Sequence, residues 1–193
     1  MKYVINFILV LLVLAFAYFL YSSINEPIEF TNEKNRREKA VIERLKQIRK
    51  AQLMYRDITD SFANNFDDLV KVLKTDSIPI VRARVNPDEV EDQNSVIYDT
   101  TFLSAYDSLQ KMNINLDSLR YVPFSNGKEF SIESGEIDYQ KTKVNVVEVG
   151  ARYKDFMGKY ADKRFKKYET GYDPDNMVKF GDINSPNLTG NWE

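Results

Sequence analysis

The chain has 193 residues, with 27 basic and 29 acidic side chains and a formal net charge of −2. This length accommodates one ordinary domain plus an anchor, and the charge balance argues against a nucleic-acid-binding protein, which would carry a basic surplus. The sequence contains neither Cys nor His, which excludes thiol nucleophiles, Ser-His dyads and imidazole metal sites.

The N-terminal segment YVINFILVLLVLAFAYFLY, residues 3–21, is apolar apart from Asn6. At ~1.5 Å per residue it nearly spans a hydrocarbon core of about 30 Å. We therefore predict a transmembrane signal anchor over residues 1–24, which contacts the lipid bilayer through residues 3–21. The alternative is a cleaved signal peptide, although Ser22 and Ser23 give only a poor cleavage pattern.

The charges that flank this segment predict its orientation. Lys2 precedes it, whereas the residues that follow begin with Glu26 and Glu29. A very short, positively charged N-terminus usually stays in the cytoplasm. We therefore predict a single-pass membrane protein with the bulk of the chain exported; in a bacterium this corresponds to the inner membrane, with the bulk of the chain in the periplasm. The alternative is a cytoplasmic domain held by an anchor of the opposite orientation.

Pro27 follows the anchor and predicts a break or kink in the backbone. We expect residues 25–32 to form a linker, with Thr31 or Asn32 capping a new helix. Residues 33–193 would then form a single soluble domain.

The pattern from Glu33 to about Ile58 is that of an amphipathic helix. Its apolar stripe repeats at 4-3-4-3 spacing over about two heptads, which is shorter than a coiled coil requires. The stripe buries against either a partner chain or the protein's own sheet. With Asn6, which can hydrogen-bond another helix within the membrane, its members are the candidate partner contacts: Val41, Leu45, Ile48, Gln52 and Tyr55.

A second helix is predicted after the interruption TDSFANN. Asn65 can cap it, and Asp67 and Asp68 suit the positive end of its dipole. Its apolar stripe must bury against another part of the protein: Phe62, Phe66, Leu69 and Leu73.

Strand patterns dominate the next part of the chain. Residues 78–85 read as an edge strand, and the acidic residues 86–95 as a loop. Residues 100–112 have helical spacing. Asn126-Gly127 is a hairpin signal, and the Val-rich residues 143–153 form the best strand pattern.

A last helix is expected at about Tyr153–Lys167, followed by an irregular tail in which Trp192 packs down. These elements predict an α+β fold: an N-terminal transmembrane helix, an amphipathic helix and a small antiparallel sheet packed with helices.

The sequence offers few patterns for catalysis or ligand binding. The run from Asp173 to Asn176 could supply oxygen ligands to Ca²⁺, but it lacks the EF-hand Gly and Glu, so a polar turn is the simpler interpretation. No Gly-rich phosphate loop is present. The basic stretch ADKRFKKYE, residues 161–169, could contact anionic lipid or polymer, or could be a solvated face. We therefore expect a protein that is not an enzyme and uses no cofactor or metal.

The stretch AVIERLKQIRKAQLMYRDITDSFANNFDDLVKVL resembles in rhythm the type IV pilins and type II secretion pseudopilins, in which an Ala-x-x-x-Tyr helix end meets a loop and a helix with spaced leucines. The matching positions are Ala51, Tyr55, Leu69 and Leu73. The resemblance covers residues 1–74 and implies a pilin-like arrangement. The N-terminus lacks the Gly and Glu of a pilin processing site, so the resemblance implies a component that is not cleaved.

The Asn-, Lys-, Asp- and Tyr-rich composition and the ending NSPNLTGNWE are similar to those of signal-anchored envelope proteins of the Bacteroidetes. Those bacteria O-glycosylate exported proteins at Asp-Ser/Thr followed by a small or aliphatic residue. The resemblance therefore implies four candidate glycosylation sites: Ser77, Thr100, Ser108 and Ser118.

Together these observations predict a membrane-anchored structural or scaffold subunit of a cell-envelope assembly, of the secretion, pilus-like or motility type. Its partners would be other envelope proteins or further copies of itself. The alternative is a periplasmic module that binds glycans or peptides.

Overall fold

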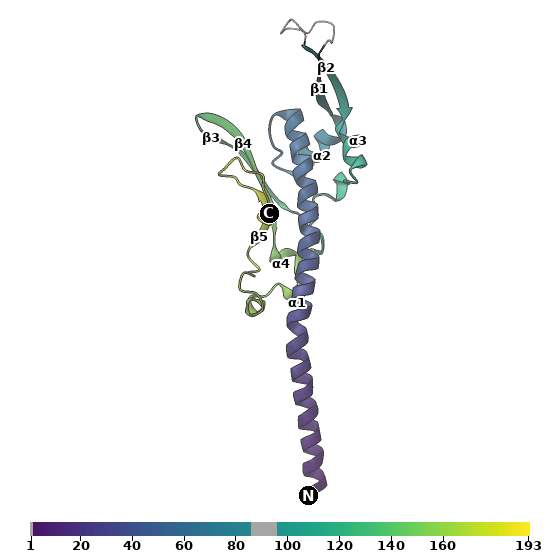
Figure 1. Ribbon diagram of the computed structural model, residues 1–193, viewed down its shortest axis with the longest axis vertical. Helices are drawn as coiled ribbons and strands as arrows, with labels where there is room; N and C mark the ends of the chain where they lie inside the picture. Colours follow the sequence, from purple (N-terminus) through teal and green to yellow (C-terminus); the bar gives the residue numbers. More distant parts are fainter. Residues whose placement is uncertain (1, 86–95) are drawn as a thin grey trace.

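A computed structural model describes residues 2–85 and 96–193, arranged along one long helix (Figure 1). Helix α1 spans Lys2–Thr59 and carries the rest of the chain on its C-terminal half. The loop predicted at residues 86–95 lies outside the described residues. The N-terminus lies at the free end of the helix, far from the sheets.

The first part of α1 is long and apolar enough to cross a membrane, and its side chains are not buried by the rest of the chain. Helix α1 has 58 residues, which corresponds to ~87 Å at the helical rise of ~1.5 Å per residue. The part that follows residue 21 therefore extends ~57 Å beyond the apolar segment.

The structure differs from the break expected at Pro27, because α1 continues through it. Pro27 removes a single hydrogen bond, to the carbonyl of Ser23, and Ser23 is exposed, so water can take the place of the missing donor. Residues 25–32 are helical instead of forming a linker. Thr31 lies inside the helix and not at a cap, and its hydroxyl donates to the Pro27 carbonyl at 2.9 Å.

Helix α2 (Phe66–Thr75) confirms the second predicted helix. Its N-cap is Asn65, whose side chain accepts a hydrogen bond from the Asp68 amide at 2.8 Å. Phe66, Leu69 and Leu73 are buried, as the stripe predicts, because this face packs into the common core with α1.

Strands β1 (Ser77–Val85) and β2 (Val96–Ser104) form a two-stranded antiparallel sheet, which confirms the strand expected over residues 78–85. The helix expected over residues 100–112 is wrong in its first part. That part pairs with β1, and helix α3 occupies only Ala105–Lys111. Apolar residues spaced for a helix can also serve a strand when a partner strand supplies the backbone hydrogen bonds.

The second sheet has the order β3-β4-β5 and is antiparallel throughout. Its strands are β3 (Ser131–Tyr139), β4 (Thr142–Arg152) and β5 (Met177–Gly181), and β4 matches the strand predicted at 143–153. The turn between β3 and β4 is Gln140-Lys141, with φ values of 49° and 68°. Asn126-Gly127 instead closes a smaller loop, flanked by a single bridge between Tyr121 and Glu129.

The helix expected over residues 153–167 is broken into three short pieces: α4 (Tyr153–Phe156), η2 (Gly158–Tyr160) and η3 (Lys163–Lys167). Gly158 lies at φ 57°, in the left-handed region, which ends α4. A further short helix, η1, spans Leu116–Ser118.

The chain is therefore α+β, as predicted, and its core runs along the upper half of α1. The sheet β1-β2 extends past the end of α1, while the sheet β3-β4-β5 lies along its side (Figure 1). Trp192 packs against the core, and Glu193 pairs with Arg49 of α1 at 2.9 Å.

Candidate functional site

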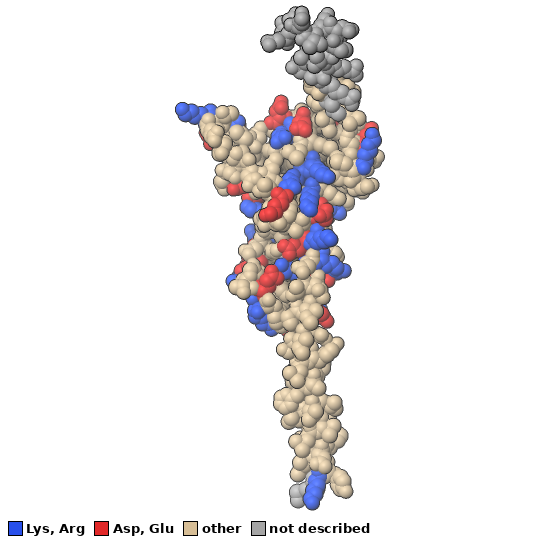
Figure 2. Space-filling model, viewed as in Figure 1, with Lys and Arg blue, Asp and Glu red and all other residues tan. Residues whose placement is uncertain are grey.

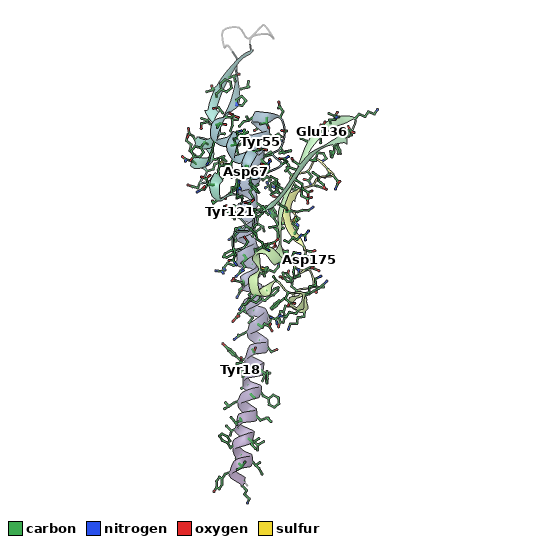
Figure 3. All side chains as sticks on the ribbon, turned by 180° about the vertical axis from the view of Figure 1, so that it is seen from behind. Tyr18, Tyr55, Asp67, Tyr121, Glu136 and Asp175 are labelled. Atoms are coloured by element: carbon green, nitrogen blue, oxygen red, sulfur yellow. The ribbon has the colours of Figure 1, made fainter. Side chains whose placement is uncertain are left out.

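The apolar stripe of α1 is buried within the chain itself. Val41, Leu45 and Ile48 are fully buried, and Gln52 is 1% exposed. Tyr55 is half-buried and packs against the same core (Figure 3). Of the two interpretations of the stripe, the structure shows burial against the protein's own domain, and a partner could reach the first four only if the domain opened.

Gln52 connects α1 to the loop that follows it. Its side-chain amide donates to the Ala63 carbonyl at 3.1 Å, and its side-chain oxygen accepts from the Ala63 amide at 3.0 Å. A polar residue within an apolar stripe is thus satisfied by backbone groups that would otherwise be buried without partners. This contact holds the loop against α1, so that the chain runs back beside α1 before α2 begins.

The other candidate residues lie apart from one another. Asn6 is exposed on the apolar part of α1. Among the candidate glycosylation sites, Ser77 and Thr100 are exposed, whereas Ser108 and Ser118 are half-buried. The hydroxyls of these two half-buried residues donate to backbone carbonyls. Ser108 donates to the Ser104 carbonyl at 2.9 Å, and Ser118 donates to the Asn115 carbonyl at 3.3 Å.

An aromatic cluster, which the sequence patterns did not reveal, attaches the C-terminal segment to α1 just above the apolar part. Phe30 stacks on Phe165 with ring centroids 5.2 Å apart, and it meets Tyr172 edge-on at 5.0 Å. Tyr160 and Tyr168 pack around the same ring. Phe30 lies within residues 25–32, which were expected to be a linker. Because α1 continues through this range, Phe30 is part of the helix and meets the C-terminal segment there.

Two tyrosine hydroxyls in this cluster make polar contacts. Tyr172 donates to the Tyr160 carbonyl at 2.7 Å, and burial raises the pKa of Tyr172 to about 12. Tyr168 donates to the Glu26 carboxylate at 2.5 Å. This hydrogen bond, followed by the nearby charges of Lys167 and Arg164, lowers the pKa of Glu26.

A buried cation lies one turn further along α1. Lys34 is 9% exposed and pairs with Glu169 at 2.8 Å and with Glu38 at 3.2 Å. Burial alone would lower the pKa of Lys34, but the hydrogen bond to Glu169 and the charge of Glu38 outweigh it, so the pKa is raised. Tyr153 donates to Glu38 at 2.7 Å, which ties α4 to the same group.

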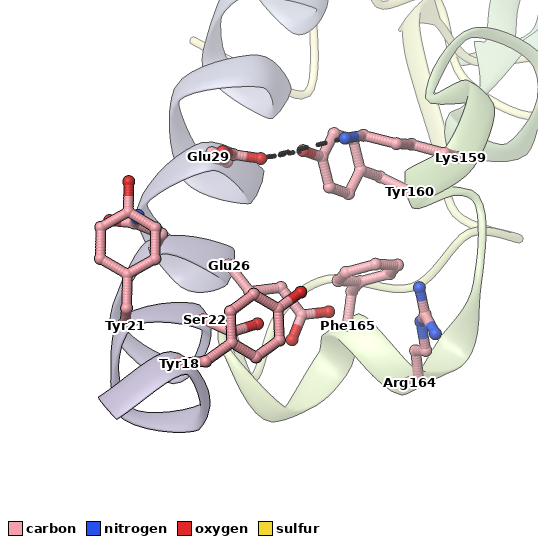
Figure 4. A pocket seen from close by; sticks show the side chains of 10 residues that line it. Tyr18, Tyr21, Ser22, Glu26, Glu29, Lys159, Tyr160, Arg164 and Phe165 are labelled. Atoms are coloured by element: carbon pink, nitrogen blue, oxygen red, sulfur yellow. Dashed lines mark hydrogen bonds and ion pairs between the residues drawn. The ribbon is translucent and has the colours of Figure 1, made fainter. Parts of the chain in front are cut away.

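A hollow of about 300 Å³ opens at the junction between the apolar segment and the domain (Figure 4). Tyr18, Tyr21 and Glu26 line it from α1, and Lys159 and Arg164 line it from the C-terminal segment. With the apolar segment in a membrane, Tyr18 and Tyr21 would lie at the membrane surface, next to the lower end of the domain.

The opposite end of the molecule exposes apolar side chains on the sheet β1-β2. Phe102 is 70% exposed, and Val81 and Leu103 are also exposed. Only β1 and β2 belong to this sheet among the described residues, so each strand has one edge that no strand covers. Such edges are ready to pair with another chain.

The Asp173–Asn176 turn is held by its own hydrogen bonds and by lysines. The Asp175 amide donates to the Asp173 carboxylate at 3.0 Å, and Asp175 pairs with Lys154 and Lys163 (Figure 3). The hydrogen bonds from these two lysines lower the pKa of Asp175 to about 2. Within the described part of the chain, no group of three or more acidic residues is placed to hold a metal ion.

The chain matches no protein-family model, no curated protein and no solved structure. Its candidate functional surfaces are therefore those that its own geometry defines, among them the hollow at the lower end of the domain and the exposed sheet β1-β2.

Proposed function

We propose that this protein is a membrane-anchored structural or scaffold subunit of a cell-envelope assembly, with the bulk of the chain in the periplasm. The observation that carries the proposal is the continuity of α1: the exposed apolar segment and the core of the domain belong to one helix. Such a helix ends ~57 Å beyond the apolar segment. It therefore holds the sheet β1-β2, which extends past that end, at a set height above the apolar segment.

The arrangement also supports the pilin-like part of the proposal. In α1, an apolar N-terminal half leads into a half that a small antiparallel sheet covers. The stripe on that second half is already buried. Contacts with other subunits would therefore be made by the apolar segment, including Asn6, and by the exposed side chains of β1 and β2.

A photo-crosslinking experiment tests this function in native membranes. A photoreactive phenylalanine analogue replaces Phe102 on β2 or, in the control, Tyr139, which is exposed on the other hairpin. We expect crosslinks to one or more envelope proteins, or to a second copy, from position 102 and not from position 139. Recovery of the protein outside the membrane fraction, or the absence of crosslinks at both positions, would contradict the proposal.

One observation favours the second candidate function, a module that binds glycans. A hollow of about 420 Å³ is lined by an aromatic ring, Tyr106, and by hydrogen-bonding side chains of Gln110, Asn113, Asn115 and Asp117. Aromatic faces beside amides and carboxylates suit sugar hydroxyls. A thermal-shift screen of the full chain with glycans would detect this function, and Tyr106→Ala should abolish any shift.

A further inference from the structure

The C-terminal segment 158–168 forms the end of the domain that faces the apolar part of α1. It carries five cations and one carboxylate: Lys159, Lys163, Arg164, Lys166, Lys167 and Asp162. The segment therefore has a basic surplus, although the whole chain has a net charge of −2. Figure 2 shows Lys and Arg atoms at the lower edge of the domain, directly above a stalk whose surface is almost free of charge.

The contacts of this segment with α1 lie at the outer edge of the lipid headgroup layer, within reach of long basic side chains. It contacts α1 through Glu26 and Glu29, which lie ~8 to ~12 Å beyond residue 21 at the helical rise. The headgroup layer on each side of a bilayer is about 5–8 Å thick. Arg164 also lines the same hollow as Tyr18 and Tyr21 (Figure 4), the tyrosines expected at the membrane interface.

The segment is held at that depth by packing. Phe165, between Arg164 and Lys166, is buried and stacks on Phe30 of α1. Because α1 is continuous, the height of Phe30 above the apolar segment is set by the helix. The chain on either side of Phe165 is therefore held at that height along α1 as long as the aromatic cluster stays packed.

Neighbouring carboxylates neutralise only part of this charge. Glu26 lies 3.8 Å from Lys167, and Glu29 lies 3.9 Å from Lys159, while Asp175 pairs with Lys163 at 3.0 Å. Within residues 2–85 and 96–193, no carboxylate pairs with Arg164 or Lys166. These two cations are thus available for an anion supplied from outside the chain.

We propose that Arg164 and Lys166, with the rest of segment 158–168, bind the phosphate groups of anionic lipids and so dock the lower end of the domain on the bilayer surface. This inference rests on the proposed membrane anchoring. Each Lys or Arg near an anionic surface contributes about 1 kcal/mol, or roughly fivefold in affinity. Docking would restrict the tilt of α1 and hence the direction in which the sheet β1-β2 extends.

The test measures lipid binding to the full chain. The protein is held in detergent micelles with equal amounts of phosphatidylglycerol and phosphatidylcholine of the same acyl chains, and the lipids that remain bound are counted by native mass spectrometry. The variant is Arg164→Gln with Lys166→Gln. The control is Lys71→Gln with Lys141→Gln, which makes the same charge change at exposed positions of α2 and the β3-β4 turn.

We expect the wild type and the control to prefer phosphatidylglycerol, and the variant to lose that preference by on the order of fivefold per cation. In the wild type, the preference should also fall as salt rises from about 0.05 M to about 0.5 M, because salt screens exposed charges. An unchanged preference in the variant, equal losses in variant and control, or a preference that salt does not change would overturn the inference.

Membrane extraction separates this inference from the proposed function. If alkaline carbonate releases the protein from native membranes, the anchoring itself fails. If the protein stays in the membrane but binds the two lipids equally, only the inference about segment 158–168 fails.

Discussion

Gln52 and Ala63 exchange two hydrogen bonds in the interior of the domain, one in each direction between the side-chain amide and the backbone. They are eleven positions apart in the chain. The pair joins the end of α1 to the loop that precedes α2, so that α2 folds back along α1. A residue that interrupts the apolar stripe in the sequence therefore holds the loop at which the chain turns.

We predict that Gln52→Ala lowers the free energy of unfolding by about 2–4 kcal/mol, because both backbone groups of Ala63 would stay buried without partners. Chemical unfolding in detergent, followed by near-UV circular dichroism, measures the change. Gln110→Ala, at an exposed position of α3, is the control and should stay within about 0.5 kcal/mol of the wild type. Equal effects of the two substitutions would contradict the role given to Gln52.

We predict that Phe30→Ala costs about 3–5 kcal/mol, as for other buried aromatic residues. The loss should be local, because Phe30 joins the C-terminal segment to α1. Hydrogen-exchange mass spectrometry should show faster exchange in residues 158–172 and little change in β1 and β2. Ile28→Ala provides the control, since Ile28 is exposed two residues earlier on the same helix. If exchange rose equally over the whole domain, the attachment would not be local.

Two glycines with positive φ differ in the space around them and allow a matched comparison. Gly127 has φ 89° and open surroundings, whereas a Cβ added at Gly181, with φ 78°, would lie 2.0 Å from the Val147 carbonyl oxygen. Both alanine variants incur about 1–2 kcal/mol of backbone strain. Gly181→Ala should cost a further 1–3 kcal/mol or so from overpacking between β4 and β5. Melting temperatures that fall equally would show that this close approach is unimportant.

The ion pairs of Asp175 predict a pH dependence. Hydrogen bonds from Lys154 and Lys163 lower its pKa from an ordinary 3.8 to about 2 in the folded protein. A lowered pKa in the folded state stabilises the fold above the unfolded pKa, and this contribution is lost as the pH falls through the folded pKa. Asp175→Asn should therefore lower the melting temperature at pH 7, and the difference from the wild type should disappear between about pH 4 and pH 2. A difference that does not change with pH would contradict the assignment.

Local patterns in the sequence predicted much of the fold. Asn65 followed by Phe66, Leu69 and Leu73 predicted α2 with its cap, because capping and apolar spacing are local properties. The Val-rich β4 was predictable for the same reason. The helix assigned to residues 100–112 was partly wrong because the pairing of β2 with β1 is a contact between distant residues, and it overrode the local spacing.

The sequence by itself determined that the chain carries an apolar segment long enough to span a bilayer and an α+β domain without Cys or His, since these depend on composition and local periodicity. Only the tertiary structure decided that α1 passes through Pro27 and that the stripe from Val41 to Gln52 faces the protein's own core. Phe30 is far in the chain from both Phe165 and Tyr172, so no local pattern could reveal its contacts with them. That packing places the basic segment beside the end of the apolar one.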